Sequence, residues 1–369
     1  MKLLVLATDY PKPDGYVASY FIHTRNKMYY ENEIEVSVIN FKATKDYIID
    51  GINVYSLKNY KRKRIYENFD ILISHAPNVR NHYIFLKKYH KRFKNIIFFF
   101  HGHEVLQSSK VYPKPYFYSK KGSQLWHIIN DLYDRFKLMI WRKYFVKLAY
   151  KSQFVFVSEW MHNMFIKFVR IDPDLIKKRT HIIYNCIGKI FEIEKYDKNS
   201  QKEFDFITIR NILDKSKYGI DIVTRIAEMN PRFTFVVVGK GNFFKYNNKP
   251  KNLIFIDRHL THEEIIEYLN RSKCALMPTR ADAQGVMACE IATFGIPIIT
   301  SNIAVCREVF DGFENVQYID NESVEINIEP LFKKRKESKH KNTKYFAENT
   351  IGKELELFHK ILDNSNTKK

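Results

Sequence analysis

The amino-acid sequence predicts an α/β protein with two domains, each built on a parallel sheet covered by helices. Short apolar segments of strand length alternate with segments of helical periodicity, a pattern typical of parallel sheets. The chain has 369 residues, which suits two domains of ordinary size. A polar stretch from Glu194 to Lys202 separates two successive series of such segments, so we place the linker there.

The first series defines a domain over residues 1–190, in which each expected strand is a short apolar run. Its expected strands are Leu3–Thr8, Glu35–Asn40, Ile71–Ser74, Ile96–Phe100, Phe154–Ser158 and His181–Asn185. Its expected helices cover residues 17–31, 80–92, 124–150 and 159–169.

The second series defines a domain over residues 191–343, with ligand expected at the carboxyl ends of its strands. Its expected strands are Phe204–Ile209, Phe233–Val238, Leu253–Ile256, Cys274–Pro278 and Ile298–Thr300. Its expected helices cover residues 219–229, 261–271, 286–294 and 304–310. Residues 344–369 form a separate part, in which Tyr345–Leu362 has helical spacing of its apolar residues.

The cysteine spacing and the lengths of the apolar runs indicate the compartment of the protein. The four cysteines, Cys186, Cys274, Cys289 and Cys306, have no metal-ligand spacing and are interpreted as reduced, cytosolic thiols. The apolar run at the N-terminus is too short for a signal peptide, and no stretch reaches the roughly 18 apolar residues that span a bilayer. We therefore expect a cytoplasmic protein, soluble or peripheral on the inner face of the cell membrane.

The net charge of +20 is concentrated in one half of the chain. Residues 51–170 hold 23 Lys and Arg against 6 Asp and Glu. Such a surface attracts polyanions: an anionic membrane, a phosphorylated lipid acceptor or nucleic acid. The alternative is an ordinary solvated basic face.

The expected helix at 124–150 allows two interpretations. Its apolar residues follow a helical stripe: Leu125, Ile128, Ile129, Leu132, Phe136, Met139 and Ile140. Large rings are added by Trp126, Trp141, Tyr144 and Phe145, and cations by Arg135, Lys137, Arg142, Lys143 and Lys147. Burial of the stripe against a sheet is the more frequent explanation, whereas contact with an anionic membrane is the other.

Residues 278–301, PTRADAQGVMACEIATFGIPIITS, carry the clearest functional pattern. A strand is followed by a loop with Asp282 and Gln284, then by a helix start at Gly285, Val286 and Met287. A helix start presents backbone N–H groups to an anion. The first carboxylate can accept hydrogen bonds from sugar hydroxyls. Eight residues after Asp282, Glu290 can hold a ribose diol, and Gly295 and Pro297 end the helix.

In these residues the chain resembles the family 4 retaining glycosyltransferases of GT-B fold. Asp282 stands where that family has Glu, and Gln284, Gly285, Glu290, Gly295 and Pro297 match its pattern. The resemblance implies two facing Rossmann-like domains and a C-terminal helix that crosses back to the first. It also implies sugar transfer from a nucleoside-diphosphate sugar.

The resemblance assigns two cations to the diphosphate. Arg210 stands at the end of the first strand of the second domain, and Lys217 precedes the helix that follows. Lys215 competes for the lysine role, because Tyr218 interrupts the usual Lys-Gly adjacency. Cations aimed at the leaving oxygen would be the largest catalytic contribution.

Further positions follow from the same resemblance. Gly239, in a Gly-Lys-Gly turn after a strand, and Arg258 would lie beside the base and ribose. In the first domain, Gly15 lies in a loop that would close over the donor, and His101 at a strand end would reach the donor sugar. For Gly15 a simple turn and for His101 a satisfied polar residue remain the alternatives.

The resemblance implies a retaining transfer without a stable covalent intermediate, and two features of the sequence predict that no metal ion is needed. No Asp-x-Asp motif follows a strand, and two cations can replace Mg²⁺. The expected function is therefore a retaining hexosyltransferase that acts on a glycan or lipid-linked acceptor in surface polysaccharide synthesis. The alternatives are a GT-B sugar-nucleotide epimerase or hydrolase, and a non-catalytic basic protein that binds polyanions. No motif indicates specific nucleic-acid binding.

Overall fold

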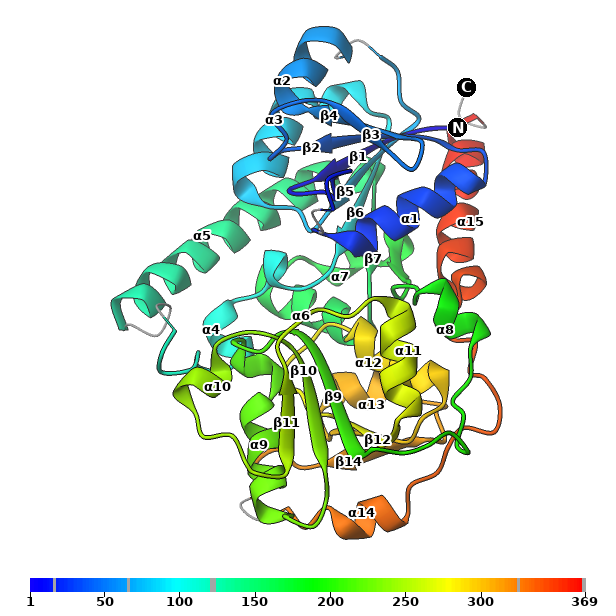
Figure 1. The fold of residues 1–369 in the computed structure, drawn as a ribbon. Helices are drawn as coiled ribbons and strands as arrows, with labels where there is room; N and C mark the ends of the chain where they lie inside the picture. The colour runs from blue at the N-terminus through cyan, green and yellow to red at the C-terminus, as the bar shows by residue number, and fades with distance from the viewer. Residues whose placement is uncertain (16–17, 65–66, 120–123, 324–325, 367–369) are drawn as a thin grey trace. The chain divides into compact units, whose positions relative to one another are not determined.

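A computed structural model describes residues 1–15, 18–64, 67–119, 124–323 and 326–366. The chain forms two compact units, each built on one parallel or nearly parallel sheet (Figure 1). The first unit is Met1–Gln107, Leu132–Cys186 and Glu348–Lys369, and the second is Ser108–Asp131 and Ile187–Ala347. The predicted α/β class with two such sheets is confirmed.

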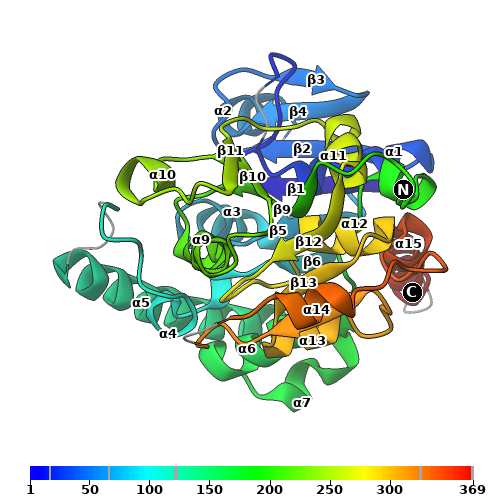
Figure 2. The ribbon, with the colours of Figure 1, turned by 60° about the horizontal axis from the view of Figure 1, so that its bottom comes forward.

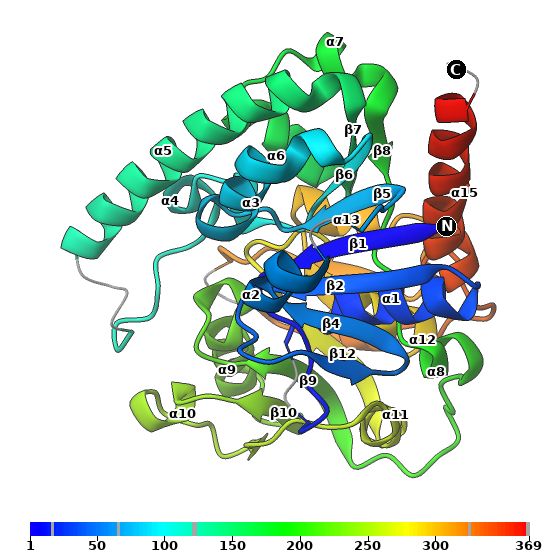
Figure 3. The same cartoon turned by 90° about the horizontal axis from the view of Figure 1, so that it is seen from above.

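The first unit holds an eight-stranded sheet in the order β3-β4-β2-β1-β5-β6-β7-β8 (Figure 3). All neighbours pair in parallel except β3 and β4. Its strands are β1 (Lys2–Ala7), β2 (Glu35–Asn40), β3 (Tyr47–Ile49), β4 (Ile52–Ser56), β5 (Ile71–His75), β6 (Asn95–Phe100), β7 (Ser152–Phe156) and β8 (Thr180–Ile182). Its helices include α1 (Tyr20–Glu31), α2 (Leu57–Asn59), α3 (Ile84–Tyr89), α6 (Glu159–Val169), α7 (Pro173–Ile176) and α15 (Ala347–Asn366).

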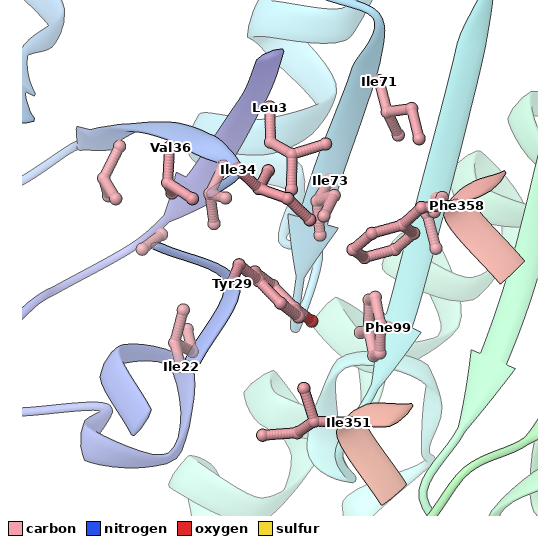
Figure 4. Close-up of a cluster of buried hydrophobic side chains, with 14 of the residues drawn as sticks. Leu3, Ile22, Tyr29, Ile34, Val36, Ile71, Ile73, Phe99, Ile351 and Phe358 are labelled. Atoms are coloured by element: carbon pink, nitrogen blue, oxygen red, sulfur yellow. The ribbon is translucent and has the colours of Figure 1, made fainter. Parts of the chain in front are cut away.

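The C-terminal helix α15 packs into the core of the first unit, as the sequence predicts (Figure 4). Phe358 lies edge-on to Tyr29 of α1, with the ring centroids 5.2 Å apart. Arg25 of α1 donates its Nε–H to Glu354 of α15 at 2.9 Å, and both side chains are fully buried. Apolar contact and a buried ion pair therefore fix the last helix to the first.

The second unit holds a six-stranded parallel sheet in the order β11-β10-β9-β12-β13-β14 (Figure 2). Its strands are β9 (Phe204–Ile212), β10 (Phe235–Lys240), β11 (Leu253–Ile256), β12 (Ser272–Met277), β13 (Ile298–Ser301) and β14 (Val316–Ile319). Its helices are α4 (Ser108–Val111), α8 (Lys189–Ile193), α9 (Ile220–Met229), α10 (Phe243–Tyr246), α11 (His262–Asn270), α12 (Val286–Phe294), α13 (Ala304–Val309) and α14 (Glu329–Lys333). After β9 the chain adds β10 and β11 on one side of that strand, and then β12, β13 and β14 on the other. Doubly wound sheets bind ligand at such a reversal of strand order, which here falls between β9 and β12.

The second unit includes a segment that the sequence analysis places in the first domain. Ser108–Asp131 clusters with the second unit, although it lies within the range 1–190. Its Tyr116 hydroxyl donates to Asp221 at 2.8 Å, and its Tyr118 hydroxyl donates to Asp214 at 2.8 Å. Two tyrosine hydrogen bonds thus hold the segment against the loop that follows β9 and the first turn of α9.

The apolar stripe of helix α5 (Gln124–Leu148) is exposed and not buried against a sheet as expected. Trp141, Phe145 and Leu148 are fully buried, but the predicted stripe lies on the opposite face. Ile128, Ile129, Leu132, Phe136 and Met139 are exposed, so burial against a sheet is the wrong explanation for them. The expected helix start at residue 17 and the side chain of Leu125 lie outside the described residues.

Candidate functional site

The candidate site of the second unit lies at the carboxyl ends of β9 and β12. Arg210 lies near the end of β9, and its side chain is 7% exposed. Its Nη2 donates to the Pro278 carbonyl at 2.7 Å. Its buried Nε–H has no hydrogen-bond partner among the described residues. A buried guanidinium donor without a partner costs free energy unless a ligand satisfies it, and an anion is the natural match.

Lys217 lies beside Arg210 in a short 3₁₀ turn, Ser216–Tyr218. Its Nζ is 3.9 Å from the Asp282 carboxylate, which follows β12. The exposed Lys215 precedes the turn. Of the two lysines proposed from the sequence, Lys217 is therefore the one that the structure pairs with Asp282.

The ring of Tyr218 lies against both cations, a feature that the sequence motif does not reveal. The Arg210 guanidinium is 5.2 Å and the Lys217 ammonium 4.8 Å from the ring centroid. Burial lowers the pKa of Arg210, and the Asp282 carboxylate opposes that shift. Arginine stays protonated in proteins, so the group remains a cation. The ring face stabilises two neighbouring positive charges that would otherwise repel.

The loop that carries Lys217 is fixed by hydrogen bonds from the loop after β12. Arg280 binds both carboxylate oxygens of Asp221, at 2.8 and 2.6 Å. The same side chain donates to the Ser216 carbonyl at 2.9 Å. The backbone N–H of Arg280 and the hydroxyl of Thr279 both donate to the Lys217 carbonyl. These contacts hold Lys217 where Asp282 can meet it.

Helix α12 begins at the same strand ends. Its N-cap Gly285 has φ 76°, a left-handed conformation that favours glycine, and Gly295 with φ 99° ends the helix. The backbone N–H groups of the first residues, Val286 and Met287, belong to the turn that has no intrahelical partner. Gln284 is buried before the helix, with its amide nitrogen 4.0 Å from the Cys289 sulfur.

Glu290 lies in the second turn of α12 and is 5% exposed. One carboxylate oxygen accepts the Gly188 N–H at 3.0 Å, and His262 Nε2 lies 3.9 Å away. Burial raises the pKa of Glu290 to about 7, although the Gly188 hydrogen bond opposes the shift. A Cβ atom at Gly188 would lie 2.7 Å from the His262 ring, so a side chain there would displace that ring. Gly188 and His262 are functional candidates that the sequence analysis missed.

Gly239 and Arg258 have local structural roles. A Cβ atom at Gly239 would lie 1.9 Å from the Arg210 carbonyl oxygen, so the glycine permits close packing of β10 on β9. Arg258 forms an ion pair with Glu264 at 2.6 Å and is half exposed. Neither observation tests contact with a nucleotide, which stays a prediction.

Two predicted positions belong to the first unit. His101 follows β6, and its Nε2 lies 3.0 Å from Nδ1 of His75. Burial lowers the pKa of both imidazoles well below the ordinary value, so both rings are neutral. Gly15 follows β1 with φ 86°, and a Cβ atom there would meet nothing within 4 Å. Its glycine is required by the turn conformation and not by a close neighbour.

Among the described residues, no group of three or more His, Cys, Asp and Glu side chains is placed to hold a metal ion. All four cysteines are buried and free, which agrees with the expected reduced thiols. Metal independence itself stays a prediction.

The two largely parallel sheets, with a cationic site at the strand ends of the second, indicate a protein of GT-B fold. Comparisons with known proteins agree with that fold. Residues 191–349 match the family model of the glycosyl transferases group 1. Sucrose-phosphate synthase from Thermosynechococcus elongatus has a similar structure, with a TM-score of 0.65 and 10% identity over 87% of this chain and 86% of that one. The Anabaena protein HepE, solved with UDP and glucose, has a TM-score of 0.54 and 12% identity over 84% of this chain and 82% of that one. The predicted GT-B fold is confirmed.

A relative of known role is the O-antigen biosynthesis glycosyltransferase WclY of Escherichia coli, which is 28% identical over 170 residues. The match covers 43% of this chain and 47% of WclY. The chain thus spans about half the length of the curated relatives it matches. The resemblance noted from the motif is therefore confirmed for the second half, which is similar to the glycosyl transferases group 1.

Proposed function

We propose that this protein is a retaining hexosyltransferase of family 4 type, which moves a sugar from a nucleoside-diphosphate sugar to a glycan or lipid-linked acceptor. The observation that carries the proposal is the buried guanidinium of Arg210, whose Nε–H has no partner and which lies with Lys217 at the strand ends. A diphosphate supplies the acceptor oxygens and negative charge that this pair lacks. The match of residues 191–349 to the glycosyl transferases group 1 supports the same ligand.

The chemistry needs neutralisation of charge more than a nucleophile. The acceptor hydroxyl oxygen forms a bond to the anomeric carbon as the bond to the diphosphate oxygen breaks. The departing phosphate oxygen takes the hydroxyl proton, and both events occur on one face of the sugar. Arg210, Lys217 and the N–H groups at the start of α12 stabilise the leaving charge, while Asp282 binds sugar hydroxyls. Two cations make a metal ion unnecessary in this proposal.

The ribose of the donor would lie against Glu290. A carboxylate can accept two hydrogen bonds from the 2′- and 3′-hydroxyl groups of a ribose. Glu290 lies in the second turn of α12, the helix whose start would bind phosphate. Gly188 already donates one hydrogen bond to this carboxylate, which orients it. His262, whose Nε2 lies 3.9 Å from the same carboxylate, would contact the nucleoside next to the ribose.

We place the reaction in the cytoplasm, at the membrane surface where surface polysaccharides are assembled on lipid carriers. The similarity to WclY and the basic first half of the chain support this location. Among the described residues, no helix is both long and apolar enough to cross a membrane.

The experiment is thermal-shift screening of the purified protein against UDP, GDP, ADP and their sugars, followed by transfer assays with the donor that binds. A ligand that binds only the folded state raises the unfolding temperature with its occupancy. NMR of the product should show the anomeric configuration of the donor. An inverted product would refute retention, and epimerised or hydrolysed donor without transfer would indicate the alternative enzyme. No shift with any nucleotide would refute the proposal.

A further inference from the structure

We propose that the exposed apolar stripe of α5 docks this protein on an anionic lipid bilayer. The stripe consists of Ile128, Ile129, Leu132, Phe136 and Met139, which are 54, 58, 61, 53 and 48% exposed. They follow one another at helical spacing along about three turns. A run of five exposed large apolar side chains on one helix face is unusual for a surface that only water covers.

The same face continues as a basic surface toward the end of α5. Lys143 and Lys147 follow Met139 at steps of four residues, and Arg135 and Arg142 lie beside the stripe. All four side chains are exposed. Half-exposed Trp126, one turn before Ile129, adds a ring suited to the interface between lipid and water.

The two acidic residues of α5, Asp131 and Asp134, are less exposed than these four basic side chains. Asp134 is 2% exposed and forms an ion pair with Lys137 at 2.6 Å. Asp131 accepts a hydrogen bond from the Ser109 hydroxyl at 2.6 Å. Among the described residues of α5, the exposed side chains are therefore apolar, aromatic or basic, while the half-buried Asp131 lies one turn before Arg135. That combination matches a bilayer with anionic headgroups.

Helix α3 and the turn before it also favour an anionic bilayer as the partner of this surface. Arg80 lies with its guanidinium 5.9 Å from the ring of Tyr133 on α5. It is exposed, as are Ile84, Lys87 and Lys88 along α3. A second apolar and basic helix edge thus lies next to α5 in the first unit. Positive charge on both helices favours a lipid surface over a second copy of this basic chain, because two such faces would repel.

This inference rests on the proposed function, in which a lipid-linked acceptor would lie in the bilayer. Docking through the stripe would bring the enzyme to that acceptor. The stripe itself contains no residue of the donor site. Loss of docking should therefore lower transfer to a membrane-bound acceptor and leave nucleotide binding intact.

The test is co-sedimentation of the full chain with phosphatidylcholine vesicles, with and without phosphatidylglycerol, at low and high salt. The double variant Leu132→Glu with Phe136→Glu should lower partition onto anionic vesicles at least about tenfold. The matched control is Ile48→Glu with Ile254→Glu, which adds equal charge at side chains that are 63 and 51% exposed. The control should bind like the wild type, and high salt should weaken binding.

Three outcomes would overturn the inference: no binding of the wild type to anionic vesicles, equal binding by the stripe variant, or a dimer in solution that the stripe variant dissociates. Thermal shift with the nucleotide separates the two proposals. Normal vesicle binding without any nucleotide response would refute the transferase and keep the docking surface. The reverse result would refute docking alone.

Discussion

The ammonium group of Lys217 lies 3.9 Å from the Asp282 carboxylate, which joins the loop after β9 to the loop after β12. Both side chains are about one-fifth exposed, so water still reaches them. A diphosphate would compete with Asp282 for Lys217, and Asp282 would then be available to sugar hydroxyls. The pair is therefore suited to a site that exchanges one polar partner for a substrate.

Removing the buried cation should lower turnover strongly. Arg210→Ala is expected to reduce kcat by about 10²–10³, the range measured when one preorganised donor to a developing anion is lost. The control is Arg271→Ala, which removes an arginine at the opposite ends of the same strands, where it pairs with Glu203. Steady-state kinetics of both variants check this, and equal kcat values would contradict the role of Arg210.

The stability of the protein should depend on Glu290 and pH. Burial raises the pKa of Glu290 to about 7, whereas the unfolded chain titrates near 4.5. Between these values the unfolded chain loses its proton first, so the folded state becomes less stable as pH rises. The loss should reach roughly 3 kcal/mol above pH 7.

Glu290→Gln should remove this dependence, because glutamine does not titrate. Urea unfolding of wild type and variant at mildly acidic and mildly basic pH measures the difference. The exposed Glu267→Gln is the control. Nucleotide affinity of the wild type should also rise as pH passes about 7, since the ionised carboxylate is the better hydrogen-bond acceptor. Parallel pH profiles for wild type and Glu290→Gln would contradict the buried carboxyl group.

A side chain at Gly239 should disturb the end of β9. In Gly239→Ala the new Cβ would start 1.9 Å from the Arg210 carbonyl, and the position has φ 147°. We expect a loss of about 2–5 kcal/mol of stability from strain and overpacking together. Gly15→Ala, where a Cβ meets nothing within 4 Å, should cost only the strain of about 1–2 kcal/mol. Chemical denaturation compares the two, and an equal loss would show that the clash relaxes.

The buried ion pair should dominate the attachment of α15. Glu354→Ala leaves Arg25 buried without its partner and should cost about 3–5 kcal/mol. The exposed Glu356→Ala on the same helix should change stability by less than about 0.5 kcal/mol. Thermal or urea unfolding of both variants measures the two losses of stability, and equal losses would contradict the role of the ion pair.

Metal independence is checked with chelator. Transfer activity should persist in excess EDTA, because in this proposal Arg210 and Lys217 would neutralise the leaving group. Complete loss that only Mg²⁺ or Mn²⁺ restores would contradict this prediction.

The order of helices and strands could be read from the sequence where apolar periodicity is strong. The expected ranges of β2, β11, α6 and α12 coincide with the observed ones. The short strands β3, β4 and β14 were not predicted, because none of them has an uninterrupted apolar run of more than three residues. Periodicity also shows that α5 has apolar residues on one face, but it does not show whether protein covers that face.

The site was predictable only where its residues are close in sequence. Asp282, Gly285 and Glu290 lie in one motif, so their spacing predicts their arrangement. Gly188 meets Glu290 from 102 positions away, and no local pattern indicates that contact. Tertiary packing of this kind has to be seen in the structure.

The most direct test is a structure of the second unit's site with a bound nucleoside diphosphate, chosen from the thermal-shift screen. We expect pyrophosphate oxygens within hydrogen-bond distance of Arg210 Nε, Lys217 Nζ and the N–H groups at the start of α12, with the ribose hydroxyls on Glu290. A nucleotide bound elsewhere, with the Arg210 Nε–H still unpartnered, would contradict it.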